Sequence, residues 1–304
     1  MADAKFTYLA RVPEATYGTT PATPPFVKSR FTKADLSQSP TLVDTTEIRA
    51  DGMIGDSVKV FADVKGGFDF EFSATDLDDI LAAAFRSTWA AGVLYNGVVL
   101  SSFTFEKKLL SNVFMTYVGC VVDSFMLKIS PKKIISGQVK LMGKISSESA
   151  NAATGATYTS PSTNSAMSST GSVSNTSING TAYAVKDWEF TINNSTRQLD
   201  KITSDYSVDS VAIGNCGVTG KIQVYFKDAT IIPIFLNSTG TTLALTLTDG
   251  THTYAFQFPN VKFKAGGDPQ IEGNNTDLMQ QLEFVALAGT VNSTPCNIMV
   301  TRTP

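Results

Sequence analysis

The sequence contains few of the residues that carry most enzyme and metal chemistry. Among 304 residues there is one histidine, His252, and there are three cysteines, Cys120, Cys216 and Cys296. Because the cysteine count is odd and no C-x-x-C pair occurs, neither a disulfide framework nor a zinc ribbon is indicated, and we expect three buried free thiols. A single histidine also excludes a His-rich metal site. We therefore expect no metal and no cofactor.

Signatures of catalysis and of phosphate binding are also missing. The chain has no G-x-S-x-G elbow, no H-E-x-x-H helix and no G-x-x-x-x-G-K-[ST] loop. A Ser-His-Asp triad built on His252 is formally possible. This histidine, however, follows Asp249-Gly250 in a predicted hairpin, where a surface residue explains it better. We predict that the protein is not an enzyme and has no catalytic residue.

Charge is sparse, with 17% charged residues and a formal net charge of −3. Such a chain has no general basic surface for nucleic acid. No segment approaches the ~20 apolar residues of a membrane span. The first five residues lack the basic and apolar regions of a signal peptide. We expect a protein that folds in a reducing cytoplasm and contacts no membrane.

An internal repeat is the main positive feature of the sequence. Residues 64–72 (VKGGFDFEF) and 218–226 (VTGKIQVYF) share the pattern V-x-G-x-Φ-x-Φ-x-Φ at an offset of 154. Further matches in the same order join Asn96-Gly97 to Asp249-Gly250 and Phe103-x-Phe105 to Phe256-x-Phe258 at an offset of 153, and residues 27–32 to residues 185–191 at offsets of 158 and 159. The series favours an ancestral duplication. The alternative is two unrelated β-domains with similar strand patterns.

The repeated segments predict strands and hairpins. The apolar residues of both runs alternate with period 2, which is typical of a strand with one buried face. Asn-Gly and Asp-Gly predict tight hairpins, because both central residues of a type I′ turn need a positive φ. The second hairpin has alternating apolar flanks at residues 243–247 and 254–258.

One helix is predicted between the strands of each unit. In the first, Thr75 can cap the helix, and Asp76, Asp78 and Asp79 suit its first turn better than they suit a calcium loop. Its packing stripe comprises Leu77, Ile80, Leu81 and Phe85. In the second unit Thr230 is the corresponding cap, and Pro233 restricts the helix to a short or distorted one.

The fold class is therefore mainly β, with two tandem, duplicated β-sandwich or barrel-like units, each flanked by a short helix. We expect an extended N-terminal arm over residues 1–25 and a first unit over 26–145. Residues 146–180 form a Ser/Thr/Asn-rich linker or surface loop, since Glu148 is the only charged residue between Ser146 and Val185. The second unit covers residues 181–304.

Three segments resemble a known family. Residues 12–24 (VPEATYGTTPATP) resemble the opening E-x-T-Y-G-T-x-P motif of the major tail tube proteins of long-tailed (siphovirus-type) bacteriophages. Residues 47–51 (EIRAD) are similar to their E-I-R-x-D stretch, and residues 258–263 (FPNVKF) to their closing strand region. The resemblance runs from about Phe6 to Arg302. It departs from the pattern at Gly52, where a basic residue is usual, and in the length of the serine-rich linker.

This resemblance implies a structural virion protein of the tail, assembled in the host cytoplasm. Copies would form rings stacked head-to-tail into a tube, the conduit for DNA ejection, with inner-sheet strands paired around each ring. The partners would be the chain itself, the tail terminator and the tail-tip proteins, while the tape measure protein and DNA pass through the lumen without sequence-specific binding. If one unit fills one-sixth of a ring, two fused units fill one-third, so we predict a trimeric ring with pseudo-sixfold symmetry. A hexamer with the second unit outside is the alternative.

Two long connections occupy matching places in the two units, residues 37–56 and 193–215. Connections of this length are uncommon in compact domains without a function. The resemblance implies that they contact the next ring. The candidate contact residues are Leu42, Glu47, Ile48, Arg49, Asp51, Met53, Arg197, Leu199, Asp205 and Tyr206.

Two other classes of protein stay open at this point. A duplicated β-domain binding module, such as a tail-tip or adhesin-like protein, suits the polar linker, although the missing export signal argues against an adhesin. A carbohydrate-active enzyme would need two facing carboxylates. Pairs such as Glu47 with Asp51, or Glu283 with Asp277, can be imagined, but nothing in the sequence brings them together.

Overall fold

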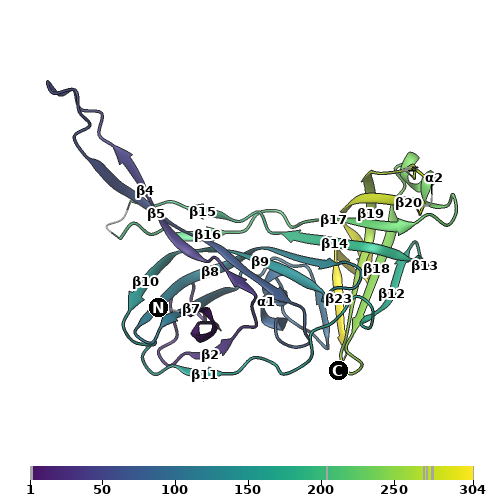
Figure 1. Cartoon of the computed structure of the whole chain (residues 1–304), viewed down its shortest axis with the longest axis horizontal. Helices are drawn as coiled ribbons and strands as arrows, with labels where there is room; N and C mark the ends of the chain where they lie inside the picture. Colours follow the sequence, from purple (N-terminus) through teal and green to yellow (C-terminus); the bar gives the residue numbers. More distant parts are fainter. Residues whose placement is uncertain (1–2, 203–204, 270, 272, 275–276, 304) are drawn as a thin grey trace.

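The computed structural model describes residues 3–202, 205–269, 271, 273–274 and 277–303. It confirms the mainly β prediction: strands dominate, and the helices are η1 (Ala4–Phe6), α1 (Asp78–Ala84) and α2 (Ile231–Leu236). Among the described residues, no helix has the length and apolar character needed to cross a membrane. The molecule is a β-sandwich from which one hairpin projects as an arm (Figure 1).

The strands fall into two successive groups along the chain. The first group comprises β1 (Tyr8–Pro13), β2 (Pro25–Lys28), β3 (Lys33–Ala34), β4 (Ser37–Asp44), β5 (Ser57–Glu71), β6 (Val93–Tyr95), β7 (Ser102–Leu110), β8 (Val113–Ile129), β9 (Ser136–Gly143), β10 (Ile145–Ser149) and β11 (Thr157–Thr159). The second comprises β12 (Val173–Ile178), β13 (Thr181–Ala182), β14 (Val185–Asn193), β15 (Arg197–Leu199), β16 (Ser210–Ala212), β17 (Gly217–Tyr225), β18 (Thr241–Thr248), β19 (Thr253–Ala265), β20 (Met279–Ala286), β21 (Gly289–Val291), β22 (Thr294–Cys296) and β23 (Met299–Thr303).

One continuous antiparallel layer runs through both groups, and we call it the eight-strand sheet. Counting β3 and β4 as one broken strand, its order is β3/β4, β5, β9, β8, β14, β17, β20 and β19. The first four strands belong to the first group and the last four to the second. The groups meet where β8 pairs with β14, from Trp188 opposite Ile129 to Asn193 opposite Ser124.

Two long strands connect this sheet to the other layer of the sandwich. The first part of β8 pairs with β7 and β10, and its last part pairs with β9 and β14. In the same way the first part of β19 pairs with β18 and β23, and its last part pairs with β20. In each group a hairpin, β7–β8 in the first and β18–β19 in the second, therefore packs over the four strands that the group contributes to the eight-strand sheet.

The 154-residue offset matches the structure around β5 and β17. Gln38 lies opposite Val64, and Ile192 lies opposite Val218, so each strand and its neighbour keep the same offset. A helix follows both strands. Beyond the helices the spacing changes, because residues 85–101 with β6 connect α1 to β7, whereas only four residues connect α2 to β18. Duplication itself stays a prediction.

Two of the other sequence matches join strands in different places. Phe103 and Phe105 lie in β7, the first strand of its hairpin with β8, whereas Phe256 and Phe258 lie in β19, the second strand of its hairpin with β18. Residues 27–28 lie in β2, which pairs with β1 and β11, while residues 185–191 lie in β14. A pattern of alternating apolar residues indicates a strand, but it does not indicate where that strand lies in a sheet.

The Asp249-Gly250 hairpin is confirmed, although residues 249–252 form its loop and Asp249 lacks the positive φ of a tight type I′ turn, and the Asn96-Gly97 hairpin is wrong. β18 and β19 pair from Thr248 opposite Thr253, and Gly250 has a φ of +94°. In contrast, the side-chain oxygen of Asn96 accepts a hydrogen bond from the backbone N–H of Asn297, and β6 pairs with the C-terminal β23. Long-range contacts therefore override the local turn preference at Asn96.

Two segments expected to be irregular are part of the sandwich. The predicted N-terminal arm contains β1, which lies between β2 and β7 and buries Leu9, Ala10 and Arg11. The tract 146–180 contributes most of β10, which pairs with β8, and β11 and β12, which pair with β2 and β18. Met167 and Ile178 in this tract are 1% exposed. A polar composition did not predict this order because the strand partners lie far away in sequence.

The helix predictions are right in place and partly wrong in capping. The N-cap of α1 is Leu77, without a side-chain hydrogen bond, while Thr75 has a φ of +67° and its N–H donates to the hydroxyl of Tyr254. Thr230 is the N-cap of α2, as expected, but its side chain makes no capping hydrogen bond, and Pro233 lies in the first turn as expected. The predicted packing stripe of α1 is at most 3% exposed at Leu77, Ile80, Leu81 and Phe85.

The larger hydrophobic core runs through both groups, and a smaller cluster of Ala10, Val12 and Phe26 lies under β1 and β2. Aromatic rings pack between the layers in each half, with Phe68 6.2 Å from Phe105 and Phe190 5.3 Å from Phe256 between ring centroids. Phe72 of the first group meets Tyr254 of the second edge-on at 5.4 Å. Such a shared core makes the two groups one packed body.

Candidate functional site

The eight-strand sheet has one apolar and one polar face, because successive residues of a strand point to opposite sides. On the core side lie residues such as Phe68, Val139, Phe190 and Ile222, each at most 2% exposed. The other side we call the polar face, and its residues include Lys33, Asp69, Glu71, Met126, Lys128, Gln138, Glu189, Thr191, Thr219, Lys221, Lys262, Glu283 and Val285.

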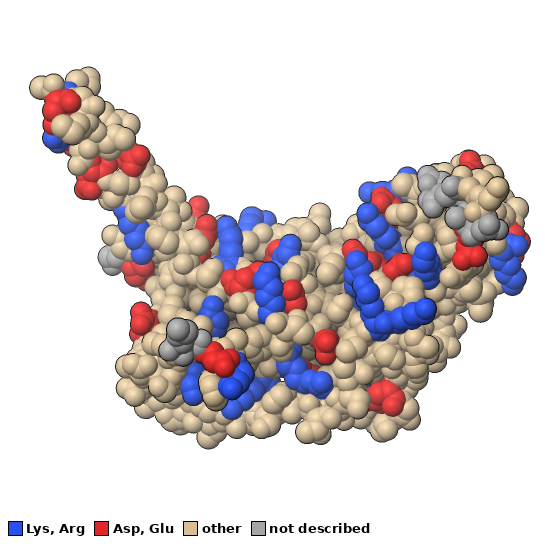
Figure 2. Space-filling model, in the orientation of Figure 1, with Lys and Arg blue, Asp and Glu red and all other residues tan. Residues whose placement is uncertain are grey.

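Neighbouring residues of the polar face form rows across the sheet. One row runs without a break through all eight strands in register, namely Lys33, Asp69, Gln138, Met126, Thr191, Thr219, Val285 and Lys262. Acids and bases alternate on this surface, and Figure 2 shows both kinds mixed over the middle of the molecule. A broad surface of mixed charge such as this one differs from an enzyme cleft, which is lined mostly by apolar residues.

The arm is the projecting hairpin of β4 and β5 beyond the sheet (Figure 1). Its large apolar side chains have no cover: Ile48 is 104%, Ile54 69% and Met53 66% exposed. Leu42 is 58% exposed. Exposed apolar residues gathered on one projection are typical of a surface that contacts another molecule.

The E-I-R-x-D stretch forms the tip of this arm. The Arg49 guanidinium donates two hydrogen bonds to the Asp51 carboxylate, at 3.0 and 2.7 Å, and the backbone N–H of Met53 donates to the same group at 3.1 Å. These bonds lower the pKa of Asp51. The stretch therefore shapes a turn, and Glu47 lies beside it next to Gly55. Glu47 and Asp51 make no cleft for acid–base chemistry.

The second long connection folds back on the first group of strands. Arg197 and Leu199 lie in β15, which pairs with β16. The ring of Tyr206 lies 4.6 Å from the Lys59 ammonium of β5, and the Asp205 carboxylate accepts hydrogen bonds from Ser207. The two sets of candidate contact residues thus occur on one side of the molecule, one set on the arm and one near its base. Residues 203–204 of this connection lie outside the described residues.

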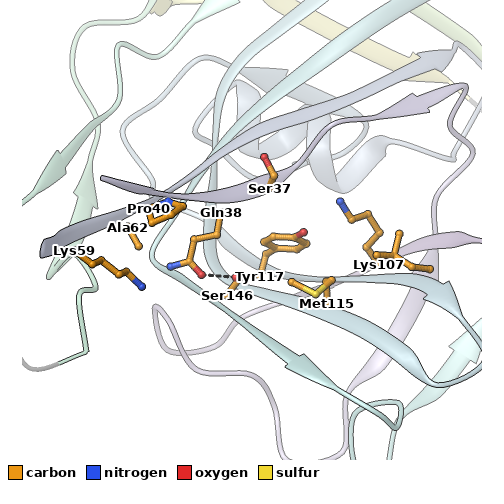
Figure 3. A pocket seen from close by; sticks show the side chains of 10 residues that line it. Ser37, Gln38, Pro40, Lys59, Ala62, Lys107, Met115, Tyr117 and Ser146 are labelled. Carbon is orange, nitrogen blue, oxygen red and sulfur yellow. Dashed lines mark hydrogen bonds between the residues drawn. The ribbon is translucent and has the colours of Figure 1, made fainter. Parts of the chain in front are cut away.

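A hollow of about 350 Å³ lies at the base of the arm (Figure 3). Tyr117, Gln38 and Lys107 line it. The Lys107 ammonium donates to the carbonyl of Leu36 at 2.6 Å, and burial lowers its pKa. Since no carboxylate lines this hollow, it does not provide the acid pair of a glycosidase.

The other candidates for chemistry have structural explanations. His252 lies in the β18–β19 turn, as predicted. Its ring nitrogen is 3.1 Å from the Asp249 carboxylate. Burial raises the thiol pKa of Cys120, Cys216 and Cys296, which disfavours reactive thiolates. Glu283 pairs with Lys221 rather than with Asp277. Within the described part of the chain, no three His, Cys, Asp or Glu side chains gather as metal ligands would.

The N-terminal motif was recognised only by resemblance, and the structure gives its physical role. The Glu14 carboxylate accepts hydrogen bonds from the N–H groups of Gly18 and Gly119, both at 2.8 Å, and from the hydroxyls of Ser102 and Thr104, at 2.6 and 2.8 Å. It therefore holds the turn after β1 against β7 and β8. Spacing alone could not predict the partners on β7 and β8, Ser102, Thr104 and Gly119, because they lie about a hundred residues from Glu14.

Two partly buried ion pairs around α1 are also not indicated by the sequence. Arg11, 2% exposed, donates to the Asp79 carboxylate at 2.8 and 2.7 Å, and Arg302 pairs with Asp78. In the sequence, Asp78 and Asp79 are already explained by the first turn of a helix. Their basic partners, Arg302 and Arg11, lie near the two ends of the chain, so spacing does not indicate them.

Comparison with known proteins gives one result. The model of the family described as "Phage tail tube protein" matches residues 7–286. No curated protein sequence matches the chain. The match covers most of both strand groups, and so includes the arm, the eight-strand sheet and both helices.

Proposed function

Because the chain belongs to the phage tail tube protein family, we propose that copies of it assemble into stacked rings that form the wall of the tube, the conduit through which DNA is ejected. Membership makes it a structural component of the virion tail. Members of such a structural family are typically not enzymes. The rings, the conduit and assembly in the host cytoplasm are the proposed part.

The β8–β14 junction is the observation that carries the proposal. It joins two four-stranded sheets edge to edge within one chain, through six residue pairs. β14 occupies in its half the place of β3/β4, and β8 occupies the place of β19. The same junction can therefore form between chains, with β19 of one copy beside β3/β4 of the next.

The two outer edges of the sheet are open for this pairing. Among the described residues, β3 and β4 pair with β5 alone, and β19 pairs with β20 alone from Lys262 to Ala265. An unpaired strand edge presents free N–H and C=O groups and is a template for another strand. Repetition of this contact closes a ring if each copy adds the right rotation. The polar face would then line the lumen.

Each chain would fill two positions in the wall, so we propose a trimeric ring with pseudo-sixfold symmetry. Stacking would use the arm, with Leu42, Glu47, Ile48, Arg49, Asp51 and Met53, and the connection beside its base, with Arg197, Leu199, Asp205 and Tyr206. Further partners would be the tail terminator and tail-tip proteins at the two ends of the tube. The tape measure protein and DNA would occupy the lumen.

Electron microscopy of the purified chain tests the proposal. We expect rings or tubes in negative stain at high protein concentration. A chain that stays monomeric at every salt and protein concentration would contradict it. Immunogold labelling of the phage separates this function from a tail-tip binding module, since label along the whole tail supports a tube and label at one end opposes it.

A further inference from the structure

Four adjacent strands of the sheet carry alternating charges in one row of the polar face. The row runs from Lys128 on β8 to Glu189 on β14, Lys221 on β17 and Glu283 on β20, and each residue lies directly opposite the next. The Lys128 ammonium is 3.5 Å from the Glu189 carboxylate, and that of Lys221 is 2.9 Å from Glu283. We call these four residues the charge ladder.

The ladder joins the two halves of the chain at their junction. Lys128 and Glu189 pair across β8 and β14, so one ion pair connects the first four strands to the last four. The Lys221 ammonium donates a hydrogen bond to the Glu283 carboxylate, and this bond, together with the negative charges of Glu283 and Glu189, raises the pKa of Lys221. Each lysine of the ladder therefore has a carboxylate beside it.

The four side chains are too exposed for this arrangement to matter mainly for stability. Their exposed fractions range from 34% for Glu189 to 58% for Lys221. Solvent and salt screen ion pairs at such positions, which leaves them a small net effect on folding. What the pairs do change is the field above the sheet, because every positive charge of the row is cancelled within a few ångströms.

We propose that the charge ladder keeps the polar face from binding duplex DNA. DNA adheres to a protein when lysines neutralise its phosphates and release the bound counterions. A lysine already paired with a carboxylate offers little of this gain. Without the two acids, Lys128 and Lys221 would stand unpaired on a face that also carries Lys33 and Lys262, and a binding surface for phosphates would result. This proposal rests on the proposed function, in which DNA passes along this face.

DNA binding by the unassembled chain tests the ladder. We would titrate wild type and the double variant Glu189→Gln/Glu283→Gln with a short fluorescent DNA duplex and follow its anisotropy over a range of salt concentrations. The wild type should show no binding near physiological ionic strength. The double variant should bind, with an apparent affinity that falls with salt at a logarithmic slope of about −2, as for two uncovered lysines.

Two further variants serve as controls. Adding Lys128→Gln and Lys221→Gln to the double variant should abolish the binding, whereas Glu148→Gln in β10, outside the ladder, should leave the chain without affinity for DNA. Circular dichroism confirms that each variant is folded. If the folded double variant binds no DNA, if Glu148→Gln binds as tightly, or if the wild type already binds, the proposal is overturned.

The result of the DNA titration can be distinguished from the result of the assembly experiment that tests the proposed function. Because the titration uses the unassembled chain, it measures the effect of Glu189 and Glu283 on DNA affinity whether or not tubes form. Failure of the wild type to form rings or tubes would contradict the proposed function and would leave the measured effect of the two acids on DNA affinity unchanged.

Discussion

At the scale of single residues, buried polar side chains define how the helix α1 is held. Arg11 connects β1 to the helix through Asp79, and its guanidinium also donates to the hydroxyl of Ser29 at 2.6 Å. A buried guanidinium with all these partners is stable only while they remain, since an unpaired buried charge is costly.

Arg11→Met should therefore lower the free energy of unfolding by about 2 kcal/mol, because Asp79, Ser29 and the carbonyl of Asp76 lose the hydrogen bonds that Arg11 donates. Urea denaturation followed by fluorescence measures this change. Lys5→Met is the matched control, since Lys5 is exposed and a surface substitution should stay within about 0.5 kcal/mol. Equal midpoints for the two variants would show that the Arg11 network adds nothing.

Asp76 predicts a dependence of stability on pH. It is 5% exposed, one of its carboxylate oxygens has no hydrogen-bond partner, and burial raises its pKa. A carboxyl whose pKa is higher in the folded state favours folding below its unfolded pKa, and this contribution is lost as pH rises through the folded pKa. Asp76→Asn should thus be more stable than the wild type at neutral pH, by on the order of 1 kcal/mol.

The difference between Asp76→Asn and the wild type should shrink as pH falls toward the ordinary carboxyl range, where Asp76 is protonated in both states. Thermal denaturation between acidic and neutral pH measures this convergence. A constant difference across that range would mean that the charge of Asp76 is not the cause.

At the scale of elements, the open edge of β4 is the surface on which ring formation depends. The N–H of Asp35 points inward to the carbonyl of Gly67, so by alternation along the strand the N–H of Gln38 points to the open side. Gln38→Pro removes this donor and leaves the pairing with β5 in place.

Gln38→Pro should give a folded chain that forms no rings, whereas Gln38→Ala should assemble like the wild type. Size-exclusion chromatography with light scattering measures both. Normal assembly of the proline variant would exclude β4 as the contact edge.

The arm should serve stacking rather than ring closure. Replacing residues 46–55 with Asn-Gly shortens the hairpin to a tight turn between Thr45 and Asp56, whose backbones already pair at 2.9 Å. We expect this variant to form single rings but no tubes in negative stain. Tubes of normal length would exclude the arm from the inter-ring contact.

Some elements could be predicted from the sequence because their signals are local. Alternation at residues 64–72, the Asp249-Gly250 turn and the acidic start of α1 all report on a few neighbouring residues. The order of the tract 146–180 and the buried place of β1 depend on strands far away in sequence. The resemblance supplied the E-x-T-Y-G-T motif, but only the structure gives its role, in which Glu14 binds the N–H groups of Gly18 and Gly119.

The polar face could not be assembled from the sequence for a related reason. Lys128 and Glu189, or Lys221 and Glu283, are separated by about sixty residues in each case. Their pairing depends on the register of three strand contacts. A shift of one residue in any of them would turn the charged side chains to the core side.

At the scale of the whole molecule, one chain contains two four-stranded sheets that β8 and β14 join edge to edge. If copies pair as proposed, the contact between β19 of one chain and β3/β4 of the next would repeat the geometry of the intrachain β8–β14 contact. The arm projects from the first half of the chain. The corresponding part of the second half is the β15–β16 connection, which does not project but lies against β8 and β5. A ring built this way would therefore carry one arm for every two wall positions.

The number of chains in one ring tests this account most directly. Cryo-electron microscopy of the tube, or native mass spectrometry of isolated rings, gives both the symmetry and the mass. We predict three chains of 32.5 kDa in each ring, with pseudo-sixfold density in the inner wall. Six chains in each ring, with the second half of every chain on the outside, would contradict it.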